Sequence, residues 1–188
     1  MSNEYKDWIE DQKNAPIDSP DHNYWLCYKY PWLIPHNHWT DEEIEDFDFS
    51  YTELDGMPEG WKKAFGEQIC EEIQKLLEEA DYVYKYRILQ IKEKFGGLRW
   101  YDNTVPESIR ERLNAIITKY EDLSERTCVE CGAPATKIST GWISPWCDKC
   151  AEEIHDNFVP IDEWFKKQET PFADGITLHW VSIEPFSH

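Results

Sequence analysis

The stretch TCVECGAPATKISTGWISPWCDKC, residues 127–150, holds four cysteines in two pairs. Cys128 and Cys131 form the first C-x2-C pair, Cys147 and Cys150 form the second, and 15 residues lie between the pairs. A C-x2-C turn brings two sulfurs to one side of a tight backbone knuckle, and two such knuckles complete a tetrahedral site. The spacing therefore predicts a C-terminal zinc ribbon that holds one Zn²⁺ ion.

All four predicted ligands are thiolates, which leaves no coordination position for water. We therefore expect a structural site rather than a catalytic one, with iron, free thiols and disulfides as the alternatives to zinc. The residues between the pairs predict a short hairpin that bends at Gly141 and places Trp142 and Trp146 over the metal. These tryptophans either pack on the small module or form a ridge that binds a partner.

Upstream of the cysteines, residues 82–102 predict a β-hairpin. The first arm alternates, so Ile88, Gln90 and Lys92 are expected on one face. Gly96-Gly97 would supply the positive φ angles that a two-residue hairpin turn needs.

Two amphipathic helices are predicted on either side of this hairpin. The first spans residues 61–80 and the second spans 104–123, where Thr104 and Glu107 would form a capping box. Their apolar residues recur at a 3.6-residue period: Phe65, Ile69, Ile73, Leu76, Leu77, Ile109, Leu113, Ile116, Ile117 and Tyr120. Cys70 lies beside the first stripe and is expected to be a small buried residue. The predicted fold is α+β, a small antiparallel sheet with two main helices plus the C-terminal zinc ribbon.

Four segments are expected along the chain. They are a partly flexible arm (1–23), an α+β core (24–126), the zinc-ribbon module (127–157) and a C-terminal extension that packs back on the core (158–188). The extension contains ITLHWVSIE, which alternates like a strand.

Three local features are predicted in the N-terminal third. Pro16 and Pro20 are expected to break helices in the arm, apart from a short amphipathic helix near Trp8. Residues 24–40 are rich in aromatics and proline, which favours extended structure over a regular helix. Residues 46–51 alternate like a short edge strand, with an acidic surface loop as the alternative.

The charge of the chain limits its partners. The 188 residues carry 38 acids and 19 bases, a formal charge of −19, so generic nucleic-acid binding is disfavoured. The acidity either keeps the chain soluble or faces a basic partner, such as a nucleic-acid-handling protein, with residues 41–59 as a candidate surface. No apolar run approaches membrane-spanning length, and the first residues are polar, so a cytoplasmic location with no membrane partner is expected.

Residues 85–99 form a basic island in this acidic chain. The segment has a net charge of +4, from five bases against the single acid Glu93. The five bases are Lys85, Arg87, Lys92, Lys94 and Arg99. They either pair with the acids of residues 41–59, or they form a local anion site with Trp100 and Tyr101 as stacking surfaces.

The order of these motifs is similar to that of a known family. QIKEKFGGLRWY, residues 90–101, precedes TCVECGAPA, residues 127–135, and a closing cysteine pair. This order resembles a family of small phage and prophage proteins with a QIKEKFGGLRFY-like motif ahead of a zinc-ribbon-like end. In many relatives the last ligand looks like histidine, whereas here it is Cys150. The resemblance covers roughly residues 28–152, and it implies a mobile-element setting and a zinc site but no particular reaction.

No catalytic residue is predicted. His36-x-His38 lies in an irregular, Pro-flanked stretch that favours a surface turn, and Cys27 has no basic partner nearby in sequence. We therefore expect a phage-associated acidic zinc-binding protein that acts by binding another protein, such as a modulator or inhibitor of a host defence system, rather than an enzyme. The alternatives are a nucleic-acid-binding accessory factor that uses hairpin 85–99, an immunity-type inhibitor of a basic toxin, and an unrecognised hydrolase or nuclease. The residues predicted to bind a partner or an anion are Lys92, Lys94, Arg99, Trp100, Trp142 and Trp146.

Overall fold

The computed structural model describes residues 3–17, 19–37, 40, 42, 44 and 46–169. The strand expected in ITLHWVSIE and the second histidine of His36-x-His38 lie outside the described residues. The helical elements are α1 (Asn3–Gln12), α2 (Pro20–Lys29), η1 (Pro31–Leu33), η2 (Glu53–Gly56), α3 (Glu59–Trp61), η3 (Lys62–Gly66), α4 (Glu67–Glu79), α5 (Glu107–Ser124), α6 (Asp148–Ala151) and α7 (Ile161–Glu169). The strands are β1 (Ile88–Lys94), β2 (Gly97–Asp102), β3 (Lys137–Ser139), β4 (Ser144–Trp146) and β5 (Phe158–Pro160).

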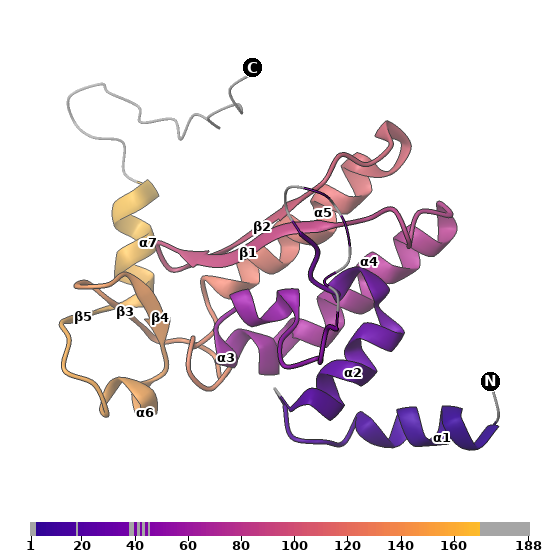
Figure 1. Cartoon of the computed structure of the whole chain (residues 1–188). Coiled ribbons are helices and arrows are strands. Elements are labelled where there is room, and N and C mark those ends of the chain that lie inside the picture. The colour runs from indigo at the N-terminus through magenta and orange to yellow at the C-terminus, as the bar shows by residue number, and fades with distance from the viewer. Residues whose placement is uncertain are drawn as a thin grey trace.

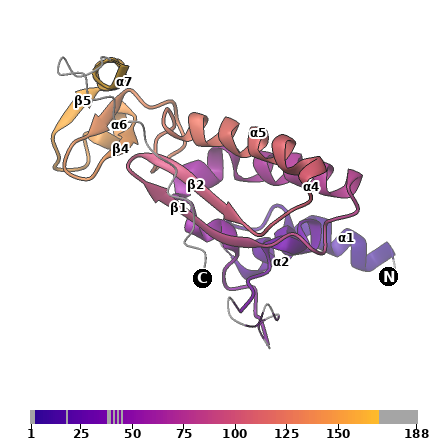
Figure 2. The ribbon, with the colours of Figure 1, turned by 90° about the horizontal axis from the view of Figure 1, so that it is seen from above.

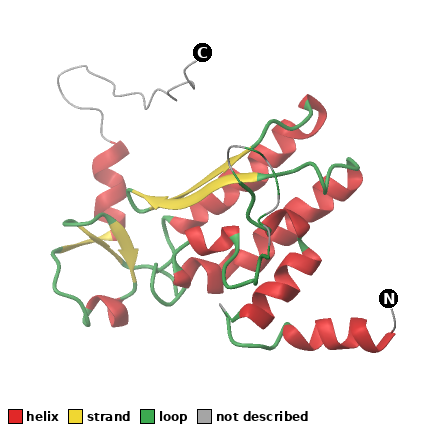
Figure 3. Ribbon diagram, viewed as in Figure 1, coloured by secondary structure: helices red, strands yellow, loops and turns green. Residues whose placement is uncertain are grey.

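Helices and two small antiparallel sheets confirm the predicted α+β class (Figure 3). β1 and β2 form a two-stranded sheet, and the second sheet has the strand order β4-β3-β5. In Figure 1, α5 runs alongside the β1–β2 hairpin, and the second sheet with α7 lies beyond the turn of that hairpin. The view from above in Figure 2 shows the same order, with α4 next to α5.

The turn of the β1–β2 hairpin lies one residue earlier than predicted. Lys94 pairs with Gly97, so the two turn residues are Phe95 and Gly96, with φ angles of 55° and 82°. Two successive positive φ angles are the geometry that matches the right-handed twist of the flanking strands. Phe95 thus takes a conformation that sequence reasoning assigned to a glycine.

A β-bulge changes which residues of β1 face the core. The register shifts between Ile88 and Gln90, so one extra residue, Leu89, has no regular partner. As a result Ile88 and Ile91 are both buried, whereas Leu89 and Gln90 are both exposed. The simple alternation predicted for this arm is therefore wrong before Gln90 and holds after it.

The two predicted main helices are present as α4 and α5. Nine of the ten residues predicted for their apolar stripes are buried, and Ile116 is half-buried. The helix predicted at 61–80 is entered through α3 and the π-helical turn η3. The capping box is wrong, because α5 begins after Pro106, which makes no side-chain cap, and the Thr104 carbonyl accepts from Tyr82 Oη instead.

The N-terminal segment is more regular than predicted. Pro20 does not break a helix but opens α2, where a missing N–H is tolerated, and Ser19 Oγ accepts from the backbone N–H of His22. Residues 24–29 belong to this helix, so the extended structure predicted for them is wrong. Ile9 of α1 is fully buried, which joins part of the expected flexible arm to the core.

The strand predicted at residues 46–51 is absent, and the acidic-loop alternative is correct. Asp46 and Phe49 have φ angles of 57° and 59°, which no strand accommodates. Asn23 Nδ2 donates to the Phe49 carbonyl at 3.0 Å, and the Phe47 and Phe49 rings pack against the core.

The C-terminal sheet extends past the boundary expected at residue 157. β5 pairs with β3, with Ile138 opposite Val159, so the first residues of the predicted extension belong to the ribbon module instead of packing on the core. None of the helices in the described part of the chain is long and apolar enough to cross a membrane. Among the described tryptophans, Trp25, Trp32, Trp61 and Trp100 lie in the core, and the first three are almost completely buried.

Candidate metal centre and hairpin face

The four cysteines of the predicted zinc ribbon meet at one point. Their Sγ atoms all lie within 4.8 Å of one another, and Cys131 Sγ lies 3.6 Å from Cys147 Sγ. In a tetrahedral site with metal–sulfur bonds of about 2.3 Å, neighbouring sulfurs are about 3.8 Å apart. Cys128, Cys131, Cys147 and Cys150 are therefore arranged so that they could bind one metal ion, and the donor set fits a thiolate-preferring ion.

Local backbone geometry builds the two knuckles. Gly132 follows Cys131 with a φ of 76° and donates its N–H to the Cys128 carbonyl at 3.0 Å. Cys147 caps α6, and the backbone N–H of Cys150 donates to Cys147 Sγ at 3.4 Å. This donor is the main reason why the pKa of Cys147 is lowered to about 7, whereas burial raises the pKa of Cys150. A bound metal ion would hold all four as thiolates.

The predicted role of the two tryptophans is half correct. Trp146 packs against the cysteine cluster, as expected, and only Cys131 of the four ligands is exposed. Trp142 instead lies on the turn between β3 and β4 and is 73% exposed. Its Nε1 donates to Glu93 Oε2 at 3.0 Å, and the turn is held because Asp156 Oδ1 accepts from the Gly141 N–H.

The first knuckle also contacts the core directly. Trp61 Nε1 donates to the Thr127 carbonyl at 2.7 Å, and the Gly60 N–H donates to the Val129 carbonyl at 2.8 Å. A Cβ atom on Gly60 would lie 2.3 Å from the Cys128 carbonyl oxygen, so only glycine fits at this contact. The four-cysteine cluster therefore lies at the junction between the C-terminal module and the core.

The second candidate site is the outer face of the β1–β2 hairpin. Cross-strand partners share a face, so the pairs Gln90–Tyr101 and Lys92–Arg99 lie together on one side. The opposite pair, Ile91–Trp100, lies on the core side, where both residues are buried. We call the outward side the hairpin face; its residues are Leu89, Gln90, Lys92, Lys94, Arg99 and Tyr101.

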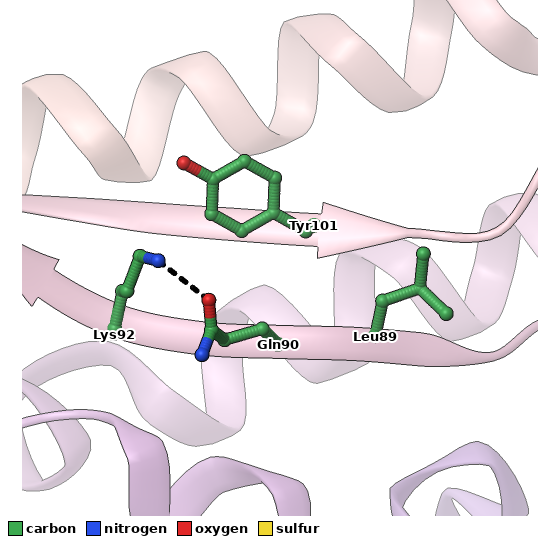
Figure 4. Close-up of a pocket in the computed structure, with 4 residues that line it drawn as sticks. All are labelled: Leu89, Gln90, Lys92 and Tyr101. Carbon is green, nitrogen blue, oxygen red and sulfur yellow. Dashed lines mark hydrogen bonds between the residues drawn. The ribbon is translucent and has the colours of Figure 1, made fainter. Parts of the chain in front are cut away.

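A shallow, open depression of about 520 Å³ lies on this hairpin face. Figure 4 shows its four lining residues, Leu89, Gln90, Lys92 and Tyr101. Lys92 Nζ donates to Gln90 Oε1 at 2.5 Å and lies 5.1 Å from the centre of the Tyr101 ring. Leu89 is 49% exposed and Tyr101 is 43% exposed, so the apolar floor of the depression is open to solvent.

None of the three lysines of the basic island has an acidic partner among the described residues. Among the described residues, no ion pair joins Lys92 or Lys94 to any carboxylate, including the described acids of residues 41–59. Lys94 Nζ lies 5.4 Å from the centre of the Phe95 ring. For these two lysines the structure does not support the internal-pairing hypothesis.

The two arginines of the island, Arg87 and Arg99, make internal hydrogen bonds to backbone carbonyls. Arg99 Nη1 donates to the Leu98 carbonyl, and its charge offsets part of the rise that burial causes in the pKa values of Glu121 and Glu125. Trp100 is only 6% exposed, and its Nε1 donates to Tyr86 Oη at 2.9 Å, so it is not the stacking surface that was predicted. Its place in the strand register turns it to the core, and the exposed ring belongs to Tyr101.

Sequence reasoning missed two exposed residues of the hairpin, Leu89 and Phe95. Leu89 is exposed because of the bulge, and Phe95, 62% exposed, because of the shifted turn. No signal in the sequence marks the bulge. The stretch FGG, residues 95–97, is by itself compatible with two positions of the turn. The structure also joins Trp142 to the hairpin turn through Glu93, which separates it from Trp146 on the metal centre.

The remaining candidates are buried or locally bonded. Cys70 is fully buried, as predicted, and burial raises its pKa well above the usual value. Burial, followed by the charge of Asp55, raises the pKa of Cys27 to about 12, so this thiol is a poor nucleophile at neutral pH. His36 Nδ1 lies 2.6 Å from the Ile34 carbonyl oxygen, which fits a turn.

No family model, no curated protein and no solved structure matches this chain. The resemblance to phage proteins therefore stays a prediction. The metal centre and the hairpin face carry the functional proposal through their own chemistry.

Proposed function

We propose that this chain is a protein-binding module, stabilised by a structural zinc ion, that binds its partner with the hairpin face. The observation that carries the proposal is the open depression in which the half-exposed Leu89 and Tyr101 share one surface with Lys92. Apolar side chains next to a cation make a small surface suited to the centre of a protein interface.

The opposite side of the same sheet explains why this surface is rigid. Ile91, Leu98 and Trp100 anchor the hairpin in the core, so the outward residues are held on a fixed backbone. A preformed face loses less conformational entropy when a partner binds than a mobile loop does. The depression is therefore a better binding surface than the acidic loop of residues 46–51.

The zinc ion has a structural role in this proposal. Four thiolates would fill its coordination sphere, so it would supply no chemistry beyond cross-linking the two knuckles. The β3–β4 turn is part of the cross-linked module, and its Trp142 contacts Glu93 next to the hairpin turn. The ion thereby supports one end of the proposed binding surface.

A role in a phage or prophage, as a modulator of a host defence system, remains part of this proposal and rests on the motif resemblance. One observation favours a second candidate, a nucleic-acid accessory factor: Lys92 and Lys94 are unpaired among the described residues and lie beside Tyr101 and Phe95. The charge of −19 on the whole chain opposes it.

Site-specific photo-crosslinking tests the protein-binding proposal. A benzophenone amino acid replaces Tyr101 in the metal-loaded full chain, and Tyr84, which is 78% exposed but lies outside the hairpin, is the matched control position. In lysate from the natural host, position 101 is expected to crosslink to one defined protein, and position 84 is not. Equal labelling at both positions, or none at position 101, would contradict the proposal.

A further inference from the structure

We infer that the hairpin face recognises an acidic segment of its partner, in which glutamates or aspartates flank an apolar side chain. This inference rests on the proposed function and specifies the chemistry of the partner. It differs from the expectation based on net charge, which pointed to a basic partner. The local charge of the face is opposite to that of the whole chain.

A partner cannot bind by adding a β-strand to the hairpin, because both edges of the hairpin are already covered. On the β2 edge, helix α5 packs against the strand, and the Leu98 N–H donates to Ser124 Oγ at 2.8 Å. On the β1 edge, Gly56 lies against the Ile91 carbonyl, where an added Cβ would come within 2.2 Å of the oxygen. A partner strand cannot reach these backbone groups, so recognition must use the side chains of the face.

The side chains of the face offer cations without acids. Lys92 Nζ lies 5.1 Å from the centre of the Tyr101 ring, and Lys94 Nζ lies 5.4 Å from the centre of the Phe95 ring. Neither lysine has a carboxylate partner among the described residues. Several lysines elsewhere have an acidic partner: Lys63 pairs with Glu59, Lys75 with Glu71, Lys119 with Glu72 and Lys137 with Asp148. A carboxylate that arrives at the hairpin face would therefore meet two ammonium groups that no internal acid neutralises.

The apolar part of the depression sets the second requirement. In the depression, Tyr101 lies beside Lys92, and Leu89 lies farther along the strand, beyond Gln90 (Figure 4). A segment that places a carboxylate on Lys92 therefore also brings its neighbouring side chains onto apolar surface. Burying that side chain adds to an ion pair that is weak by itself at an exposed site. The face thus fits a mixed acidic and apolar segment better than a purely acidic one.

Because salt screens charges over a short distance, an acidic peptide is a better partner for this face than a nucleic acid. Salt screens exposed charges beyond about 8 Å at physiological ionic strength, so a short peptide mainly senses the lysines that it contacts. A nucleic acid extends past the face and meets a surface with a total formal charge of −19. At the edge of the face it would also meet Glu121 and Glu125, two acidic residues that lie next to Arg99.

An NMR titration of the metal-loaded full chain tests the inference. The probes are a ten-residue peptide with two leucines among glutamates, the same peptide with glutamine for glutamate, and a ten-nucleotide thymidine strand. The acidic peptide is expected to shift the amide signals of residues 89–101. Replacing both lysines (K92Q with K94Q) should weaken binding roughly 2- to 30-fold, the effect expected when the free energies of two exposed ion pairs add. The matched control K75Q, on α4, should leave binding unchanged.

Three results would overturn the inference. They are no hairpin shifts at millimolar peptide, equal binding of the glutamine peptide, and tighter binding of the thymidine strand at the same sites. If position 101 crosslinks to a protein through a basic or neutral segment, the inference fails and the proposed function stands. If the acidic peptide binds the face but position 101 crosslinks to no protein, the proposed function fails while the chemistry of the face stands.

Discussion

At the scale of single residues, Trp61 links the metal centre to the core. Its ring is buried and its Nε1 donates to the carbonyl of Thr127, the residue before the first ligand. The sequence pattern predicts that Trp61 lies at the start of a helix, but it gives no reason to expect a hydrogen bond to Thr127, which is 66 positions away. Such contacts depend on how elements pack, which periodicity alone does not reveal.

Replacing Trp61 with phenylalanine should destabilise the protein. The change leaves the buried Thr127 carbonyl without its donor, and an unsatisfied buried acceptor lowers the unfolding free energy by about 1–3 kcal/mol. Trp142→Phe is the control, because this ring is 73% exposed and its bond to Glu93 is at the surface. Urea unfolding followed by circular dichroism measures both variants. Equal losses in the two variants would contradict the proposed link.

The partly buried Lys62 ammonium makes the unfolding free energy of the protein depend on pH. Burial lowers the pKa of Lys62 to about 8, and its partner Asp55 has its pKa raised by burial. Between pH 8 and the usual lysine value, the unfolded chain binds a proton at this site that the folded chain has released. The unfolding free energy of the wild type should therefore rise with pH in this window, relative to that of Lys62→Met, by about 1–2 kcal/mol.

Denaturant unfolding of both proteins at several pH values between 8 and 10 checks this expectation. Lys75→Met serves as a control for the loss of one lysine, because Lys75 is exposed on α4. Its stability should follow that of the wild type across the window. Parallel curves for wild type and Lys62→Met would show that the Lys62 ammonium is not destabilised by folding.

At the scale of elements, the hairpin shows what a sequence pattern can and cannot determine. The pattern predicted a hairpin at residues 82–102, and β1 and β2 form one. The bulge after Ile88 and the shifted turn were not predicted, because each changes the register by one residue without changing the composition. This difference decides which side chains lie on the hairpin face: the bulge places Leu89 there, and the strand register turns Trp100 to the core.

The turn of the hairpin can be stabilised. Phe95 has a φ of 55°, a conformation that asparagine adopts more readily than a bulky residue. Phe95→Asn should therefore raise the unfolding free energy by about 0.5–1 kcal/mol, since the ring is 62% exposed and little burial is lost. Phe95→Ala is the matched control, because it removes the ring but keeps the unfavourable φ. Thermal unfolding in which alanine stabilises as much as asparagine would assign the effect to the ring and not to the backbone.

At the scale of the whole molecule, the cysteine pairs were the most reliable predictor. Their spacing located the cluster at residues 128–150 because metal ligation demands fixed ligand geometry. The domain boundaries were less predictable: α2 crosses the boundary expected at residue 23, and β5 adds a strand to the ribbon sheet after residue 157. Strand pairing between distant segments and burial of Ile9 decide those limits, and neither has a local signature.

Net charge at the scale of the whole chain was a poor guide to the local surface. The formal charge of −19 suggested a basic partner, whereas the hairpin face carries Lys92 and Lys94 without acidic partners among the described residues. Net charge describes the long-range field, and contacts at an interface depend on the few groups within a screening length.

The central claim is that one metal ion on the four thiolates of Cys128, Cys131, Cys147 and Cys150 cross-links the two knuckles of the C-terminal module. High-resolution native mass spectrometry of the chain, with Cys128→Ser as the control, tests it directly. We predict one zinc ion per chain, with the four thiol protons of the cluster displaced, and loss of the ion in the variant. A metal-free chain whose mass is lowered by the four hydrogens of two disulfides, or a chain that carries iron, would contradict it.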